Sequence, residues 1–115
     1  MRTGSEWVGE DLVREALWEL ADEDVQRQVW FSPDTPNDYI EAVCELFDDS
    51  NLGDRLDKGP VFGAEVDETL RRLSSIAAQI DGYRSPEDVI SDPLMPELRR
   101  LAGEALRGLD EALPK

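Results

Sequence analysis

The stretch "PVFGAEVDETLRRLSSIAAQIDGY", residues 60–83, carries the clearest structural signal in this 115-residue chain. Its apolar residues recur at spacings of 4, 4, 3, 4 and 3, at Phe62, Val66, Leu70, Leu73, Ala77 and Ile80. Residues three and four apart share one face of an α-helix, so the pattern predicts a helix with one buried side. We expect this helix to end near Gly82, because glycine commonly follows the last helical residue.

Toward the N-terminus, residues 6–24 repeat the helical spacing. Their apolar positions are Leu12, Val13, Ala16, Leu17 and Leu20. Two alternatives stay open for residues 22–30. Either Asp22 caps a second, short helix, or the first helix continues to Trp30. Trp7 and Trp30 lie at the ends of this region, and we expect both to close the core.

A second helix is expected after the proline-containing turn at residues 32–38. Thr35, Pro36 and Asp38 are spaced as an N-cap, a first helical residue and a capping-box acid. The buried face of this helix, which extends to Asp49, is predicted to hold Tyr39 or Ile40, Val43, Cys44 and Phe47.

Two further helices are expected to begin in the C-terminal third of the chain. Ser85 and Pro86 have the N-cap and first-position pattern, and Asp92-Pro93 precedes a longer helix in whose first turn Pro96 is tolerated. The apolar side of that last helix is Leu94, Leu98, Leu101, Ala105, Leu109 and Leu113. Strand patterns are nearly absent. We therefore predict one all-α domain over all 115 residues, with five to six helices in orthogonal or bundle-like packing.

Charge narrows the classes of function. Twenty-seven acidic and 12 basic residues give a net charge of −15, and residues 1–60 hold 16 acids and 5 bases. Binding to DNA, RNA or anionic lipid is disfavoured, since these ligands require clustered Lys and Arg. An acidic surface attracts basic partners, although it also simply keeps a protein soluble.

The sequence contains little that would indicate membrane insertion, secretion or catalysis. No apolar run approaches the ~20 residues that a bilayer crossing needs, and residues 1–15 resemble no secretory signal. A single cysteine fits a reducing cytoplasm. The chain contains no histidine, which removes His-based acid–base chemistry and the common zinc sites. Cys44 lies on an apolar helical face, so we predict that it is a core residue. Because the residues for these chemistries are missing, we also predict that the protein is not an enzyme and has no cofactor.

The segment "CELFDDSNLGDRLDKG", residues 44–59, has the composition of a calcium loop but the wrong spacing. Counted from Asp48 or Asp49, position 12 is Gly59 or Pro60, where an EF-hand requires a bidentate acid. We predict no metal site. Asp49 or Ser50 is instead expected to cap a short helix whose Leu52 and Leu56 are buried. The four aspartates Asp48, Asp49, Asp54 and Asp57 would then face water.

The first helix supplies the sharper functional signal. Its acids succeed one another four residues apart, at Asp11, Glu15, Glu19 and Glu23. Each like-charge pair at this spacing costs ~0.2–0.5 kcal/mol, so the ladder works against stability and indicates a binding surface as readily as a solvated face. Trp18 lies at the edge of the ladder, one turn from Arg14, which could cover its ring. Burial of Trp18 under a second helix is the favoured alternative.

These observations predict a non-enzymatic protein that binds a basic protein partner through its N-terminal half. The partner-binding residues would be Asp11, Glu15, Trp18, Glu19, Glu23, Asp48, Asp49, Asp54 and Asp57. In size, acidity and helicity the chain is similar to bacterial immunity proteins and antitoxins that neutralise basic nucleases, without a shared motif. The resemblance implies a toxin as the partner. The alternative is an assembly subunit that forms a homodimer through the apolar faces of residues 60–83 and of the last helix.

Overall fold

The computed structural model describes residues 9–32 and 38–112. These residues form seven α-helices and one π-helical turn, η2, and contain no strand, which confirms the all-α prediction. In chain order the elements are α1 (Gly9–Ala21), α2 (Glu23–Trp30), α3 (Tyr39–Cys44), η2 (Glu45–Asp49), α4 (Leu52–Lys58), α5 (Ala64–Gln79), α6 (Pro86–Ile90) and α7 (Met95–Ala112). The helices outnumber the predicted five to six because the break after α1 creates an additional helix.

That break lies at Asp22, whose extended backbone has φ −127° and ψ 115°. Its carboxylate accepts hydrogen bonds of 2.8 and 3.3 Å from two backbone N–H groups in the first turn of α2. On the other side, the buried Gln26 donates from Nε2 to the carbonyl oxygens of Glu19 and Leu20, at 3.2 and 2.8 Å. Both helix ends are therefore capped, which decides between one helix and two.

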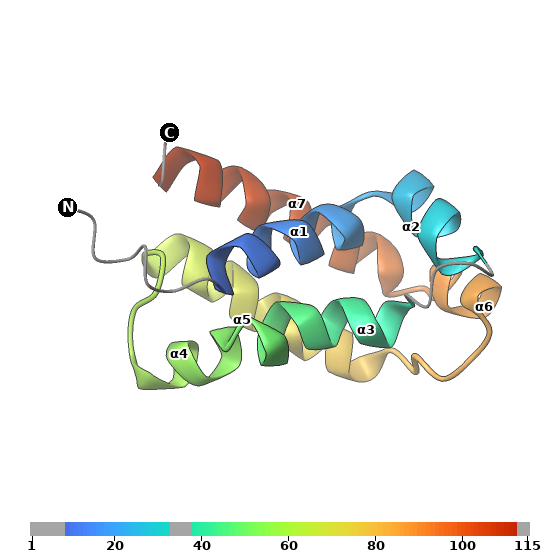
Figure 1. Cartoon of the computed structure of the whole chain (residues 1–115), viewed down its shortest axis with the longest axis horizontal. Coiled ribbons are helices and arrows are strands. Elements are labelled where there is room, and N and C mark those ends of the chain that lie inside the picture. Colours follow the sequence, from blue (N-terminus) through green and yellow to red (C-terminus); the bar gives the residue numbers. More distant parts are fainter. Residues whose placement is uncertain (1–8, 33–37, 113–115) are drawn as a thin grey trace.

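The core lies where α7 packs against α1 and α5 (Figure 1). The predicted stripe of α5 is buried at Val66, Leu70, Leu73, Ala77 and Ile80, whereas Phe62 is half-buried. On α7 the buried members of the predicted stripe are Leu98, Leu101, Ala105 and Leu109, with Leu94 half-buried. Leu113 lies outside the described residues. The two clearest apolar stripes of the sequence thus face the interior of one chain.

The α3–η2 segment runs back alongside α1 (Figure 1). Its buried side chains are Tyr39, Ala42 and Leu46. The prediction that Val43, Cys44 and Phe47 are buried is therefore only partly confirmed: all three are half-buried, and Val43 and Phe47 pack against the edge of the core. Both sets of residues have helical spacing. The docking of this segment on α1 selects the stripe that faces inward.

The start of α3 also differs from the prediction. Asp38 is the N-cap, and its carboxylate accepts a 2.9 Å hydrogen bond from the backbone N–H of Glu41. It is not a capping-box acid in the third helical position. Thr35 and Pro36, the predicted first residues of this helix, lie outside the described part of the chain, as does Trp7.

Short helices form the two ends of the molecule, which measures 44 × 27 × 23 Å. At one end, η2 leads into α4, and the Ser50 hydroxyl accepts a 3.1 Å hydrogen bond from the N–H of Leu52. Leu52 and Leu56 are buried, as predicted. At the other end, α2 packs against α6 (Figure 1). In the described residues, no helix combines the length and the apolar character that membrane crossing requires.

Candidate functional site

Trp18 lies on the outer side of α1 with 54% of its surface exposed. The favoured prediction of burial is wrong, because the neighbouring helices cover the opposite side of α1, formed by Val13, Ala16, Leu17 and Leu20. Arg14 does not depend on the indole for a partner. Its guanidinium donates to the carboxylate of Asp110 at 2.5 Å and to the carbonyl of Leu109 at 3.4 Å, both on α7.

Glu19 departs from the predicted solvated ladder. Only 8% of this residue is exposed, and its carboxylate accepts a 2.6 Å hydrogen bond from the indole N–H of Trp30. The Trp30 ring in turn meets Tyr39 edge to face, with centroids 6.0 Å apart. Burial raises the pKa of Glu19, while the hydrogen bond from Trp30 opposes that rise. Glu19 thus joins α1 to α2 and is not part of the surface.

Glu23 also does not belong to the predicted row of acids on α1, for a different reason. The turn at Asp22 places it on α2, where its carboxylate pairs with Arg27 at 2.9 Å and with Arg99 at 3.5 Å. Arg99 also donates to the Gln26 side chain at 3.1 Å. Of the four acids predicted on one helix face, only Asp11 and Glu15 are exposed on α1.

A second row of acids, of which only Asp49 belonged to the predicted site, lies on the elements that pack against α1. Glu41, Glu45 and Asp49 follow one another four residues apart on α3 and η2. Glu45 lies near Glu15, whose negative charge acts on it. The pKa of Glu45 is raised to about 7, first by burial and then by the neighbouring carboxyls of Glu15, Glu19 and Asp49. The four-residue spacing is the sequence signal that could have revealed this row.

We name as the Trp18 surface the exposed ring and acids of α1 together with two acids of η2, the element that packs against α1; its residues are Asp11, Glu15, Trp18, Glu45 and Asp49. Asp48 is exposed next to Asp49 on η2. Cys44 precedes this turn, and burial together with Asp48, Asp49 and Glu41 raises its thiol pKa. A raised pKa disfavours the thiolate, which is the reactive form of cysteine.

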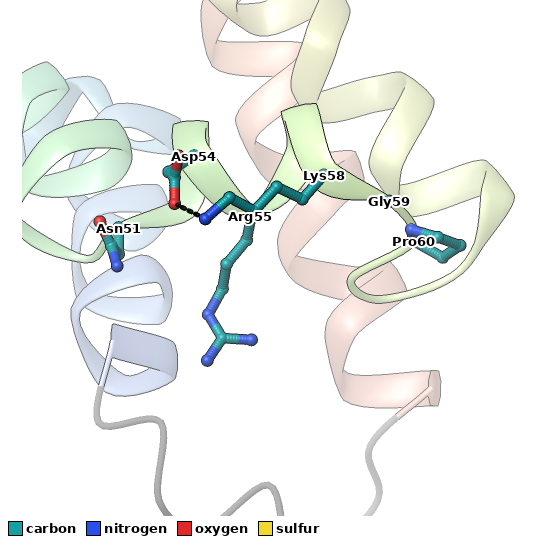
Figure 2. A pocket seen from close by; sticks show the side chains of 6 residues that line it. All are labelled: Asn51, Asp54, Arg55, Lys58, Gly59 and Pro60. Carbon is teal, nitrogen blue, oxygen red and sulfur yellow. Dashed lines mark ion pairs between the residues drawn. The ribbon is translucent and has the colours of Figure 1, made fainter.

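The remaining predicted acids, Asp54 and Asp57, lie on α4 among residues of opposite charge. Lys58 pairs with Asp54 at 3.1 Å, and Arg55 points away from this pair (Figure 2). These side chains line an open hollow of about 450 Å³, together with Asn51, Gly59 and Pro60. With two acids and two bases, α4 has no excess of negative charge. The strongly acidic region is therefore formed by α1 and η2.

Across residues 9–32 and 38–112, no three histidine, cysteine or acidic side chains are grouped as metal ligands would be. Comparison of the chain with protein-family models, with curated proteins and with solved structures found no match. The chemistry of the Trp18 surface is that of a cation acceptor. An exposed indole offers a face for a guanidinium or ammonium group, and the carboxylates beside it supply negative charge.

Proposed function

We propose that this chain is a non-enzymatic binding protein whose Trp18 surface receives a basic segment of a protein partner. The most concrete version is an immunity or antitoxin-type inhibitor of a basic protein. The observation that carries the proposal is the exposed Trp18 on α1, a helix that also exposes Asp11 and Glu15 and that packs against the acidic η2. Large aromatic residues that become buried on binding are the side chains most often found to dominate interface energies.

A partner that covers the exposed indole of Trp18 would gain free energy by removing its apolar surface from water. An aromatic side chain buries ~150–250 Å² when covered, at ~25 cal/mol per Å². With 54% of the residue still exposed, covering Trp18 would contribute roughly 2–3 kcal/mol to a complex. Cation–π attraction to an Arg or Lys of the partner would add ~0.5–2 kcal/mol.

The acids around the indole would act mainly on the rate of encounter. Exposed charges steer an oppositely charged partner and set the dependence of binding on salt, while the covered aromatic ring holds the complex. Asp48 extends this acidic region along η2. Asp54 and Asp57 are weaker candidates, since Arg55 and Lys58 share their helix.

The assembly-subunit hypothesis finds less support. It depended on the apolar stripes of α5 and α7, and most of the described side chains of both stripes are buried within one chain, where α7 packs against α5 and α1. A homodimer would need another surface. The acidic-surface binder is therefore the function that we put to the test.

The test is a calorimetric titration against the protein encoded beside this gene. A Trp18→Ala variant should bind about 30-fold more weakly, which corresponds to ~2 kcal/mol. An Asp11→Lys, Asp49→Lys double variant should lower the association rate and weaken its dependence on salt. Tyr83→Ala and a Glu65→Lys, Glu68→Lys double variant are the matched controls, because Tyr83 is 89% exposed on the loop before α6 and both glutamates are exposed on α5.

Wild-type affinity in both surface variants would exclude the Trp18 surface as the binding site. Equal losses of affinity and association rate in the two control variants would show that negative charge and exposed aromatic area affect binding wherever they lie on the surface. Either outcome contradicts the proposal.

A further inference from the structure

A small hollow of about 80 Å³ lies between α2, α3 and α6, at the end of the molecule that α2 and α6 form (Figure 1). Its walls include the aromatic rings of Trp30 and Tyr39 and the apolar side chains of Pro86 and Val89. A water molecule occupies about 30 Å³ in the liquid, so the hollow has room for roughly two to three groups of that size. It can therefore receive the end of one side chain or a very small ligand, and not a nucleotide or a sugar.

The two aromatic rings that line the hollow already have partners for their polar atoms. They meet edge to face at an interplanar angle of 81°, with centroids 6.0 Å apart. The indole N–H of Trp30 donates to Glu19, and the hydroxyl of Tyr39 donates a 2.8 Å hydrogen bond to the carbonyl of Ala77. Both residues are buried, so packing holds the rings in place. What the rings offer to a ligand is mainly their π surface, which attracts cations.

A carboxylate lies beside these rings. Asp38 also lines the hollow, and its side chain is exposed. As the N-cap of α3, it uses Oδ1 to accept a 2.9 Å hydrogen bond from the backbone N–H of Glu41. Within residues 9–32 and 38–112, no donor bonds to Oδ2. A ligand in the hollow can therefore donate to Oδ2 while the helix stays capped.

Arg84, the cationic residue in the described lining of the hollow, already has partners within the fold. Its Nη2 lies 2.6 Å from the carboxylate of Asp92, and its Nε donates to the carbonyl of Asp81 at 2.9 Å. Asp92 therefore offsets the charge of Arg84, which leaves the negative charge of Asp38 at the hollow. This balance favours a cationic ligand over an anion.

We infer that this hollow binds the ammonium end of a lysine side chain or of a small alkylamine, against the rings of Trp30 and Tyr39 and the Oδ2 atom of Asp38. An ammonium group has N–H donors for the carboxylate, and its charge is attracted to the rings. The compact ammonium of lysine fits a hollow of about 80 Å³ better than the larger, planar guanidinium of arginine. None of the residues that define the Trp18 surface lines the hollow, so the inference does not depend on the proposed function.

The test is an NMR titration of the isolated protein at constant ionic strength, with butylammonium as the probe because it reproduces the lysine side chain. The indole N–H signal of Trp30 should shift and saturate with a Kd on the order of 10 mM, as expected for a small cation that contacts few groups. 1-Butanol, which has the same chain without the charge, should bind at least about fivefold more weakly.

A capped lysine, N-acetyl-lysine methylamide, identifies the source of the ammonium group. Binding as tight as that of butylammonium would show that the site accepts a lysine of a polypeptide. Weaker binding would assign the site to a free amine. Either result supports an ammonium site, provided that butylammonium binds.

Asp38→Asn removes the charge but keeps the N-cap, since asparagine caps a helix as well as aspartate does. This variant should fold as the wild type and bind butylammonium at least about fivefold more weakly. Asp88→Asn is the control, because it makes the same change of charge at an exposed position of α6 that does not line the hollow. It should keep the wild-type affinity.

Equal affinity of the two variants for butylammonium would overturn the inference. So would equal binding of 1-butanol and butylammonium by the wild-type protein, which needs no variant to fold. Signals that shift only at the Trp18 surface would also overturn it, while the proposed function would remain standing.

Discussion

The indole N–H of Trp30 donates a 2.6 Å hydrogen bond to the carboxylate of Glu19, and this bond removes Glu19 from the acidic face of its own helix. The two residues lie eleven positions apart on successive helices. The bond also orients the Trp30 ring, which packs edge to face on Tyr39. A residue that appears from its sequence spacing to belong to a solvated ladder is thus a buried connection between α1 and α2.

Glu19→Leu should therefore destabilise the protein. The change keeps a side chain of similar size but leaves the buried Trp30 N–H without an acceptor, at a cost of about 1–3 kcal/mol. Glu19→Gln retains a carbonyl acceptor and should cost less than the leucine variant. Urea unfolding of both variants measures the difference. Equal stability of the two would show that the hydrogen bond contributes little.

Trp18 should respond to the charge of a collisional quencher. In a Trp7→Phe, Trp30→Phe background, where Trp18 is the only tryptophan, caesium should quench fluorescence more efficiently than iodide at low salt, because the neighbouring acids concentrate cations. Added salt should reduce the difference, since it screens exposed charges beyond about 10 Å at about 0.1 M. In a Trp7→Phe, Trp18→Phe background, the buried Trp30 should be protected from both ions. Equal quenching of Trp18 by the two ions would contradict an acidic environment.

Two glycines of α7 should respond in opposite directions to alanine. At Gly108 a Cβ would lie 2.6 Å from the Val66 Cγ2, so Gly108→Ala should cost about 1–3 kcal/mol by forcing α7 away from α5. At Gly103 a Cβ would meet nothing within 4 Å, and Gly103→Ala should stabilise the helix by ~0.5–1 kcal/mol. Thermal unfolding of each single variant tests the pair. A stabilised Gly108→Ala would mean that α5 and α7 are less closely packed at Val66.

Calcium should not stabilise the protein specifically. Position 12 of either EF-hand register is Gly59 or Pro60, so the bidentate ligand is missing, and Ser50, Leu52 and Leu56 fix the segment through hydrogen bonding and burial. Thermal unfolding with millimolar calcium or magnesium at matched ionic strength is the measurement. A tight ligand at ~100 times its Kd would add ~2.7 kcal/mol. A rise in Tm of several degrees with calcium alone would contradict this prediction.

Part of the candidate surface could be predicted from the sequence. The acids of α1 have a regular four-residue spacing, and Asp11 and Glu15 are exposed as that pattern indicates. The row that contains Glu45 has the same spacing but was not predicted, because Glu41 and Glu45 lie between apolar residues that were assigned to the core. The proximity of the acids of η2 to those of α1 could not be predicted, since residues so distant in sequence come together only through the docking of η2 on α1.

The amino-acid sequence alone determined that the chain is helical, that α5 and α7 bury the stripes built on Leu70 and Leu101, and that the molecule is acidic. These properties depend on residues within one or two helical turns and on composition. The tertiary structure decided which of two overlapping stripes of α3 faces the core, that Glu19 is buried against Trp30, and that Trp18 stays exposed. The reason is that local spacing defines the sides of each helix, whereas burial depends on which neighbouring helix covers a side.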